Sequence, residues 1–308
     1  MKSPTSQLLH RIDDRALAGE AAASLCARPA QVSPKFFYDT PGSRLFEAST
    51  ELDEYSTARD EAVIFSTHGP AIARAALQST GAGPVLVDLG AGNCAKAARL
   101  FGALQPRRYV AVDIAVDLMR AALLPLQREH PGFDLVGVGL DFSNRLQLPP
   151  GLVDGPALVF YPGSSNGNFA PDAAPRLLRQ ARDLAAGGAL LEAAYDDALG
   201  VTGAFNLNLL HHLNRLLGSD FNPRGWRHQA QFNPGEPRVE MYPVARAVTI
   251  VRWPGGEREF AVGERMHTKS AYKWTPEAFA AQLQTAGFNR QRHWTDVLDR
   301  FAVFLAEG

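Results

Sequence analysis
A short apolar run that ends in closely spaced glycines constrains the fold of this chain more than any other feature. Residues 85–87 lead into Asp88 and the turn Gly90-Ala91-Gly92, and helix-compatible sequence follows over residues 95–104. An apolar run closed by glycines is typical of a buried parallel strand that turns into a helix. Glycine permits unusual dihedral angles and the close approach of a ligand, and a helix start offers free N–H groups. The sequence therefore predicts the first strand–turn–helix unit of a nucleotide-type α/β sheet.

The turn after this strand differs from a phosphate-binding loop. Cys94-Ala95-Lys96 supplies no Gly-Lys-Ser/Thr ending, and Ala95 stands where G-x-G-x-x-G has its third glycine, which the looser G/A form allows. The pattern Asp-x-Gly-x-Gly resembles the turn of S-adenosylmethionine (SAM) methyltransferases. The alternative is a structural turn that binds no ligand, because short glycine motifs also occur in turns without a ligand.

Strand-like and helix-like segments alternate from residue 85 to about residue 194, which predicts a largely parallel sheet. The further strands of this part are expected at residues 108–113, 133–140, 157–161 and 189–192. Thr275 and Pro276 mark a helix start as N-cap and first helical residue. Strand-like sequence returns over residues 293–307 and suits the far edge of the sheet. The predicted fold class is α/β, a Rossmann-like seven-stranded sheet of the SAM methyltransferase type with a second, mixed α+β lobe.

The pattern is different outside the alternating part. Residues 1–30 are predicted as one amphipathic helical segment, and residues 204–217 as a helix. Short strand-like segments follow between residues 229 and 262, with a Pro254-Gly255-Gly256 turn among them. We therefore expect a methyltransferase domain of residues 61–194 plus 275–308 and a substrate-binding lobe of residues 1–60 plus 195–274.

Polar side chains stand where the predicted strands end, and ligands of open α/β sheets bind beyond those ends. Asp113 lies about 20 residues past the glycines, where a ribose-binding acid belongs; an N-cap for the helix at 116–126 is the alternative. Asp141 and Phe142 suit an adenine amino group and ring face, although Asp141 could merely cap a turn. The loop at 162–169 should face the same ligand-binding crevice as the glycines. The alternative is that it is simply a long turn.

The composition excludes several classes of protein. Of 308 residues 46% are hydrophobic, which supports a sizeable core in one large or two closely associated domains. The net charge of −1 argues against a nucleic-acid surface, and two cysteines imply no disulfide framework. The pair His211-His212 lacks spaced partners, so we expect packing rather than a metal site. No apolar run reaches transmembrane length and no signal-peptide core is present, so we expect a cytoplasmic protein.

Several motifs that follow one another along nearly the whole chain resemble a single family, the histidine Nα-methyltransferases of ergothioneine biosynthesis. Members of that family methylate the α-amino group of histidine with SAM. The matching stretches are FFYDTPGSRLF (36–46), LDEYSTARDEA (52–62), DLGAGNCAK (88–96), AVDI (111–114), LDF (140–142), PGSSNGNFAP (162–171), YDDALGVTGAFNLN (195–208), RVEMY (238–242), GERMHTKSAYKWT (263–275) and HWTD (293–296).

The resemblance implies a role for individual residues. The SAM site would use Gly90, Gly92, Lys96, Asp113, Asp141 and Phe142, with Gly163 and Ser164 nearby. Tyr38 and Asn168 would be the catalytic residues, which hold the substrate's α-amino group. Tyr55, Tyr195 and Met241 would complete the amino-acid site, Tyr195 at the carboxylate and Met241 at the side chain. For the tyrosines the alternative is a satisfied core hydroxyl. SAM would be the cofactor, and a small amino acid would be the substrate. The protein would be a monomer that binds no nucleic acid, membrane or metal.

The match departs from the family pattern where the substrate side chain would bind. The family usually has Glu-x-Ser-x-Lys after His-Thr, whereas this chain has Lys269 in place of the Glu and Ala271 in place of the Ser. A lysine ammonium cannot accept a hydrogen bond from an imidazole N–H, but it would suit a carboxylate. We therefore expect methyl transfer to the α-amino group of an amino acid, histidine by family. The alternatives are a different, acidic or polar, amino acid and, less favoured, a SAM-binding protein without catalysis.

Overall fold

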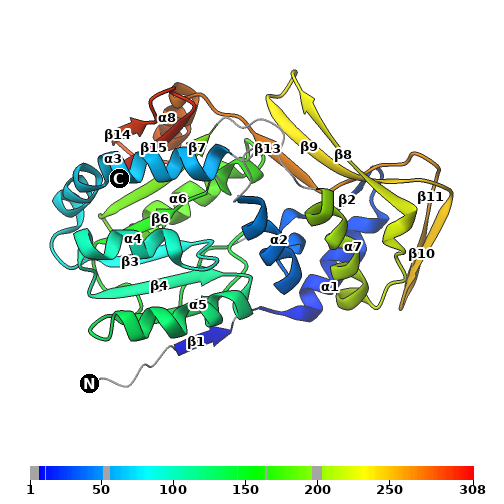
Figure 1. Cartoon of the computed structure of the whole chain (residues 1–308), viewed down its shortest axis with the longest axis horizontal. Helices are drawn as coiled ribbons and strands as arrows, with labels where there is room; N and C mark the ends of the chain where they lie inside the picture. The colour runs from blue at the N-terminus through cyan, green and yellow to red at the C-terminus, as the bar shows by residue number, and fades with distance from the viewer. Residues whose placement is uncertain (1–6, 11, 51–55, 144, 164, 196–202) are drawn as a thin grey trace. The chain divides into compact units, whose positions relative to one another are not determined.

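The chain forms two compact units in the computed structural model (Figure 1), which describes residues 7–10, 12–50, 56–143, 145–163, 165–195 and 203–308. The first unit comprises Met1–Ile12, Thr57–Asp197 and Trp274–Gly308, and the second comprises Asp13–Ser56 and Ala198–Lys273. The boundaries that we predict from the sequence differ from these units mainly at the N-terminus, where residues 1–12 belong to the first unit.

The prediction of one helix over residues 1–30 is wrong. Strand β1 (Gln7–His10) pairs in parallel with β5 (Asp134–Gly139), and helix α1 begins only at Asp14 and ends at Cys26. The reason for the late start is the N-cap, because the Asp13 side chain accepts hydrogen bonds from the N–H groups of Arg15 and Ala16. The cap fixes the first turn of α1 and leaves the residues before it free to pair with the sheet.

The first unit is built on a mixed sheet with the strand order β1-β5-β4-β3-β6-β7-β15-β14. The remaining strands are β4 (Arg108–Asp113), β3 (Val85–Leu89), β6 (Ala157–Tyr161), β7 (Ala189–Tyr195), β15 (Phe301–Glu307) and β14 (Arg290–Thr295). Pairs from β1 to β7 are parallel, and β15 is antiparallel to both β7 and β14. The predicted seven-stranded sheet with the C-terminal pair at its far edge is confirmed, and β1 is an eighth strand.

Helices cover both faces of this sheet (Figure 1). One face packs against α3 (Ser56–Thr80), α4 (Ala95–Leu104) and α5 (Val116–Glu129), and the other against α6 (Ala174–Ala185) and α8 (Pro276–Thr285). Successive strand residues serve opposite faces, as Leu86 and Val87 do. Because both faces are buried, the parallel strands are apolar almost throughout rather than alternating, which explains why they were predictable.

The second unit is the predicted mixed α+β part. It holds α1, α2 (Thr40–Thr50), α7 (Gly203–Leu217) and the single-turn helices η1 (Pro34–Phe37) and η3 (Pro223–Gly225). An antiparallel sheet has the order β13-β9-β8, with β13 (Lys269–Tyr272), β9 (Arg238–Ala245) and β8 (Trp226–Asn233). Strands β10 (Thr249–Trp253) and β11 (Gly256–Phe260) form a hairpin, and β2 (Ala30–Gln31) pairs with β12 (Met266–His267). An aromatic core that includes Phe37, Phe205 and Trp226 stabilises the unit.

None of the helices in the described ranges is long and apolar enough to cross a membrane.

Candidate functional site
The glycine turn lies at the carboxyl edge of β3, where the order of the parallel strands reverses between β4 and β6. Gly90 and Gly92 have φ angles of 72° and 52°, in the left-handed region that favours glycine. The N–H of Gly90 donates to the carbonyl of Val112 over 2.8 Å, which ties the turn to β4. A Cβ on either glycine would meet nothing within 4 Å, so the main chain of the turn borders open space. Such switch points are where ligands of open α/β sheets bind.

Asp113 connects the end of β4 to the same turn. Its Oδ2 accepts a hydrogen bond from the Gly92 N–H at 2.8 Å, and its Oδ1 accepts one from the Ala115 N–H at 2.7 Å. Burial raises the pKa of Asp113, and these backbone hydrogen bonds oppose the rise. Helix α5 has Ala115 as its N-cap with no side-chain bond, so Asp113 does not fill the alternative role of N-cap.

Asp88 is a further residue of this site, and the motifs predict no role for it. Its side chain is buried, its Oδ2 accepts a hydrogen bond from the Tyr109 hydroxyl at 2.7 Å, and its Oδ1 has no partner. Burial raises the pKa of Asp88 to about 7, against the lowering effect of the Tyr109 hydrogen bond. The signal in the sequence is the acid of the Asp-x-Gly-x-Gly pattern, of which only the glycines were predicted to contact the cofactor.

Lys96 and Gly163 meet at a second residue that sequence reasoning missed. The Lys96 ammonium forms an ion pair with Glu61 of α3, and the Gly163 N–H donates to the other Glu61 oxygen at 2.9 Å. The Glu61 side chain is only 3% exposed, whereas that of Lys96 is 39% exposed. Glu61 lies inside the matched stretch 52–62, but no sequence pattern links it to partners 35 and 102 residues away.

The neighbouring strand ends carry the other residues predicted for the cofactor and the amine. Asp141 follows β5, and its Oδ1 accepts hydrogen bonds from the N–H of Ser143 at 3.0 Å and from the Ser143 hydroxyl at 2.5 Å, as in a capped turn. The half-buried Phe142 meets Tyr161 edge to face, with ring centroids 6.0 Å apart. Asn168 ends the short helix η2 (Ser165–Asn168) after β6 and is half-buried. Ser164 lies outside the described residues.

The substrate residues predicted in the lobe are described within the second unit. The Tyr38 ring packs edge to face against Phe46 and Phe205, with centroids 5.8 Å away in each case. Met241 in β9 is 4% exposed and stands opposite Lys269 in β13, and Val239 stands opposite Ala271. Because side chains alternate between the faces of a sheet, Met241, Lys269 and Ala271 share one face.

Two of the predicted substrate residues cannot be followed in the same way. Tyr55 lies outside the described residues. Tyr195, which the predicted boundary puts in the lobe, is the last residue of β7 and pairs with Phe301 in the first unit. The strand continues past the expected end at residue 192 because β15 offers it a hydrogen-bonding partner along its whole length. The structure describes the backbone of Tyr195 and not its side chain.

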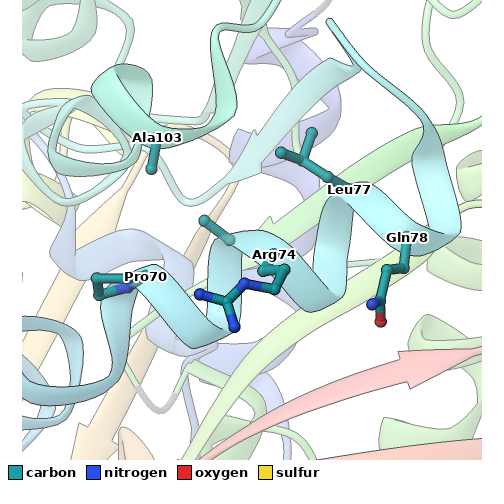
Figure 2. A pocket seen from close by; sticks show the side chains of 6 residues that line it. Pro70, Arg74, Leu77, Gln78 and Ala103 are labelled. Carbon is teal, nitrogen blue, oxygen red and sulfur yellow. The ribbon is translucent and has the colours of Figure 1, made fainter.

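A shallow hollow of about 440 Å³ lies elsewhere on the first unit, between α3 and the last turn of α4 (Figure 2). Pro70, Ala73, Arg74, Leu77, Gln78 and Ala103 line it. Figure 2 shows Arg74 as the one charged side chain among the labelled residues. Because α4 begins at the glycine turn and Ala103 is near its other end, this hollow is separate from the carboxyl edge of the sheet. It brings together neither acids nor nucleophiles.

The carboxyl edge fits the groups of SAM, whose amino-acid end carries both a carboxylate and an ammonium. The ammonium of the partly exposed Lys96 side chain suits the carboxylate, because a lysine has three donors and Glu61 takes only part of them. The unpartnered oxygen of Asp88 and the remaining lone pairs of Asp113 suit hydrogen-bond donors of the ligand. The open main chain at Gly90 and Gly92 provides the room.

This sheet order and this site define the class, that of the SAM-dependent methyltransferases. Within it, the chain belongs to the family of histidine-specific, SAM-dependent methyltransferases, whose model matches residues 17–308. SAM is therefore the methyl donor of this enzyme.

Three relatives illustrate the similarity. The chain is 36% identical over 312 residues to histidine N-alpha-methyltransferase from Mycolicibacterium smegmatis, and 34% identical over 311 residues to the protein of that name from Mycobacterium tuberculosis. Each alignment covers 94% of both chains. N-methyltransferase imqF from Aspergillus flavus is 26% identical over 93% of this chain and 82% of its own length. The similarity to the two bacterial proteins extends through both compact units.

Proposed function
We propose that this methyltransferase transfers the methyl group of SAM to the α-amino group of an amino acid and that histidine is its substrate. The observation that carries the proposal is the 36% identity, over 94% of both chains, to a protein named histidine N-alpha-methyltransferase. An identity spread over both units favours a shared substrate more than a match confined to the cofactor-binding sheet would.

The roles proposed for individual residues follow the family resemblance. SAM supplies an electrophilic methyl group on a sulfonium. The residues proposed to bind it are Gly90, Gly92, Lys96, Asp113, Asp141, Phe142, Gly163 and Ser164. Tyr38 and Asn168 would orient the amine, and Tyr55, Tyr195, Met241, Lys269 and Ala271 would hold the rest of the amino acid. Methyl transfer to an amine requires a neutral nitrogen aligned with the methyl group, so positioning and exclusion of water are the main tasks of these side chains.

A second candidate substrate is an amino acid whose side chain carries a carboxylate. The observation that favours it is the pairing of β9 with β13, which puts Lys269 across from Met241 on one sheet face. A cation at this position attracts a carboxylate and repels an imidazolium. The transferred methyl group and the cofactor would be the same in both cases.

The separate roles of the two units, the subunit number and the location in the cell are also proposals. We propose that the second unit is the substrate-binding lobe, and that the enzyme acts as a monomer in the cytoplasm. Size-exclusion chromatography with light scattering, at several protein concentrations, checks the oligomeric state. A mass of two chains would contradict it.

The substrate can be tested directly. Purified protein is incubated with SAM and each of the common amino acids in turn, and methylated products are identified by mass spectrometry. Isothermal titration with S-adenosylhomocysteine present gives the affinity for each amino acid. Histidine that is methylated and binds at least tenfold more tightly than alanine supports the proposal. If aspartate or glutamate is methylated and bound most tightly instead, the second candidate is supported. The absence of any methylated product identifies a SAM-binding protein without catalysis.

A further inference from the structure
Glu61 is a buried carboxylate near the glycine turn for which neither the motifs nor the family resemblance gives a role. It lies near the start of α3, and the whole residue is 2% exposed. A carboxylate removed from water is costly unless charges and hydrogen bonds compensate for the loss of hydration. The contacts that stabilise Glu61 therefore indicate what this carboxylate does for the first unit.

The first contact is to the start of α4. The Lys96 ammonium pairs with Glu61 Oε2, and Lys96 is the second residue of the helix that follows the glycine turn. The Lys96 side chain is 39% exposed, and its ammonium has three donors, of which the ion pair with Glu61 uses only part, so the others are available to an anion.

The second contact is to the loop after β6. The Gly163 N–H donates to Glu61 Oε1 at 2.9 Å, and the φ angle of Gly163 is 81°. A Cβ at this position would lie 3.2 Å from Lys96 Nζ, so the loop and the ammonium are in close contact. One carboxylate thus joins α3, the start of α4 and the loop after β6.

The surroundings of Lys96 explain why an anchor is needed. The charges of Lys96, Glu61 and Asp113 all act on the buried carboxyl of Asp88. An ammonium that is not held has acidic groups of the turn itself as alternative partners, and pairing there would withdraw it from an incoming ligand.

We infer that Glu61 is a positioning residue of the cofactor site, which holds the Lys96 ammonium and the Gly163 loop where they receive the carboxylate of SAM. The inference rests on SAM as the cofactor, and not on which amino acid is methylated. Glu61 touches no reacting atom in this role and acts through Lys96 and Gly163.

The neighbouring residue provides a matched control. Asp60 is also buried, at 8% exposure, and lies on the same helix, but its carboxylate pairs with Arg300 at 2.9 Å. Asp60→Asn and Glu61→Gln therefore remove one buried charge each from adjacent positions. Only Glu61→Gln removes it from the partners Lys96 and Gly163.

The test compares Glu61→Gln, Asp60→Asn, Lys96→Met and the double variant Glu61→Gln/Lys96→Met. Titration calorimetry gives the Kd for SAM and for S-adenosylhomocysteine, and steady-state kinetics give KM for SAM separately from kcat. For Glu61→Gln we expect both Kd and the KM for SAM to rise about tenfold, since hydrogen bonds to charged groups are of that strength. At saturating SAM, kcat should stay within about threefold, while Asp60→Asn should change neither Kd nor KM.

The double variant separates positioning from general loss of structure. A glutamine oxygen can still accept the hydrogen bond from the Gly163 N–H, so Glu61→Gln acts chiefly by removing the ion pair with Lys96. The double variant should therefore bind SAM no more weakly than Lys96→Met alone, because coupled residues are not additive. The inference would be overturned if the losses of SAM affinity in Glu61→Gln and Lys96→Met multiplied in the double variant. It would also be overturned if Glu61→Gln bound SAM as tightly as the wild type, or if Asp60→Asn lost as much SAM affinity as Glu61→Gln. Because calorimetry with SAM does not depend on the amino acid, this result is distinct from a failure of the histidine proposal.

Discussion
The hydroxyl of Tyr109 donates a hydrogen bond to Oδ2 of Asp88 over 2.7 Å, between neighbouring parallel strands in the buried centre of the sheet. The bond stabilises the ionised carboxylate, but burial outweighs it and raises the pKa of Asp88 to about 7. Asp88 therefore changes its charge near neutral pH at the base of the glycine turn.

This pKa predicts a pH dependence of stability. The folded protein keeps a proton on Asp88 that the unfolded chain releases above its pKa of 3.8, so the Asp88 contribution falls as the pH rises from about 4 to 7. Asp88→Asn cannot ionise, so its free energy of unfolding should improve relative to wild type by about 2.5 kcal/mol between pH 5 and pH 8. Urea unfolding at both pH values measures the difference. A difference that does not change with pH would show that Asp88 titrates normally.

The backbone of Gly90 predicts a loss of cofactor affinity on substitution. Gly90→Ala introduces a Cβ that meets no protein atom within 4 Å, so it projects into the space where we place SAM. The positive φ of 72° adds a folding cost of about 1 kcal/mol. Gly187→Ala is the control, because Gly187 has a φ of 84° and equally open surroundings in the turn between α6 and β7. We expect similar losses of stability, but a SAM Kd raised at least tenfold in Gly90→Ala alone. Equal SAM affinities of the two variants would contradict the placement.

Glu240 predicts a pH effect of the opposite sign in the second unit. Burial alone would raise its pKa, but hydrogen bonds from the Tyr242 hydroxyl at 2.5 Å, Asn233 Nδ2 at 3.1 Å and Arg238 Nε at 2.7 Å lower it to about 2. Its contribution to stability is complete above the ordinary value of 4.5 and is lost as the pH falls towards 2. Glu240→Gln should therefore be destabilising at pH 7, and the deficit should shrink by about 2 kcal/mol at pH 3. Chemical unfolding at the two pH values tests this, and a deficit that stays constant would refute it.

Lys269 predicts which side chain the enzyme prefers. Lys269→Glu restores the acid that the family pattern has here, so an imidazole N–H would gain an acceptor. We expect kcat/KM for histidine to rise about tenfold, and any activity on aspartate or glutamate to fall by a similar factor. Ser270→Ala is the control, because Ser270 points to the other face of β13 and contacts His267 at 3.0 Å. A histidine activity unchanged by Lys269→Glu would place Lys269 away from the substrate.

The sequence predicts the central sheet well because its signals are local. Strands β4 and β6 and helix α4 begin and end at the predicted residues, since each apolar run is bounded by a turn or a cap. Strand β1 was missed because its four residues become a strand only through the edge of β5, more than a hundred residues later. Glu61 was missed for the same reason, since its partners are distant along the chain. Motifs therefore point to the residues proposed to bind the ligand, whereas the contacts of Glu61 with Lys96 and Gly163 are seen only in the folded structure.

The two units alternate along the chain, which has an evolutionary consequence. The first unit comprises Met1–Ile12, Thr57–Asp197 and Trp274–Gly308, and the second comprises Asp13–Ser56 and Ala198–Lys273. The polypeptide passes between the units at residues 12, 56, 197 and 273, so no single cut in the gene separates one from the other. Exchanging the second unit for that of another protein would require two simultaneous replacements at matching junctions. If the second unit binds the substrate, as we propose, new substrate preferences should arise by point mutation within strands such as β13 rather than by domain shuffling.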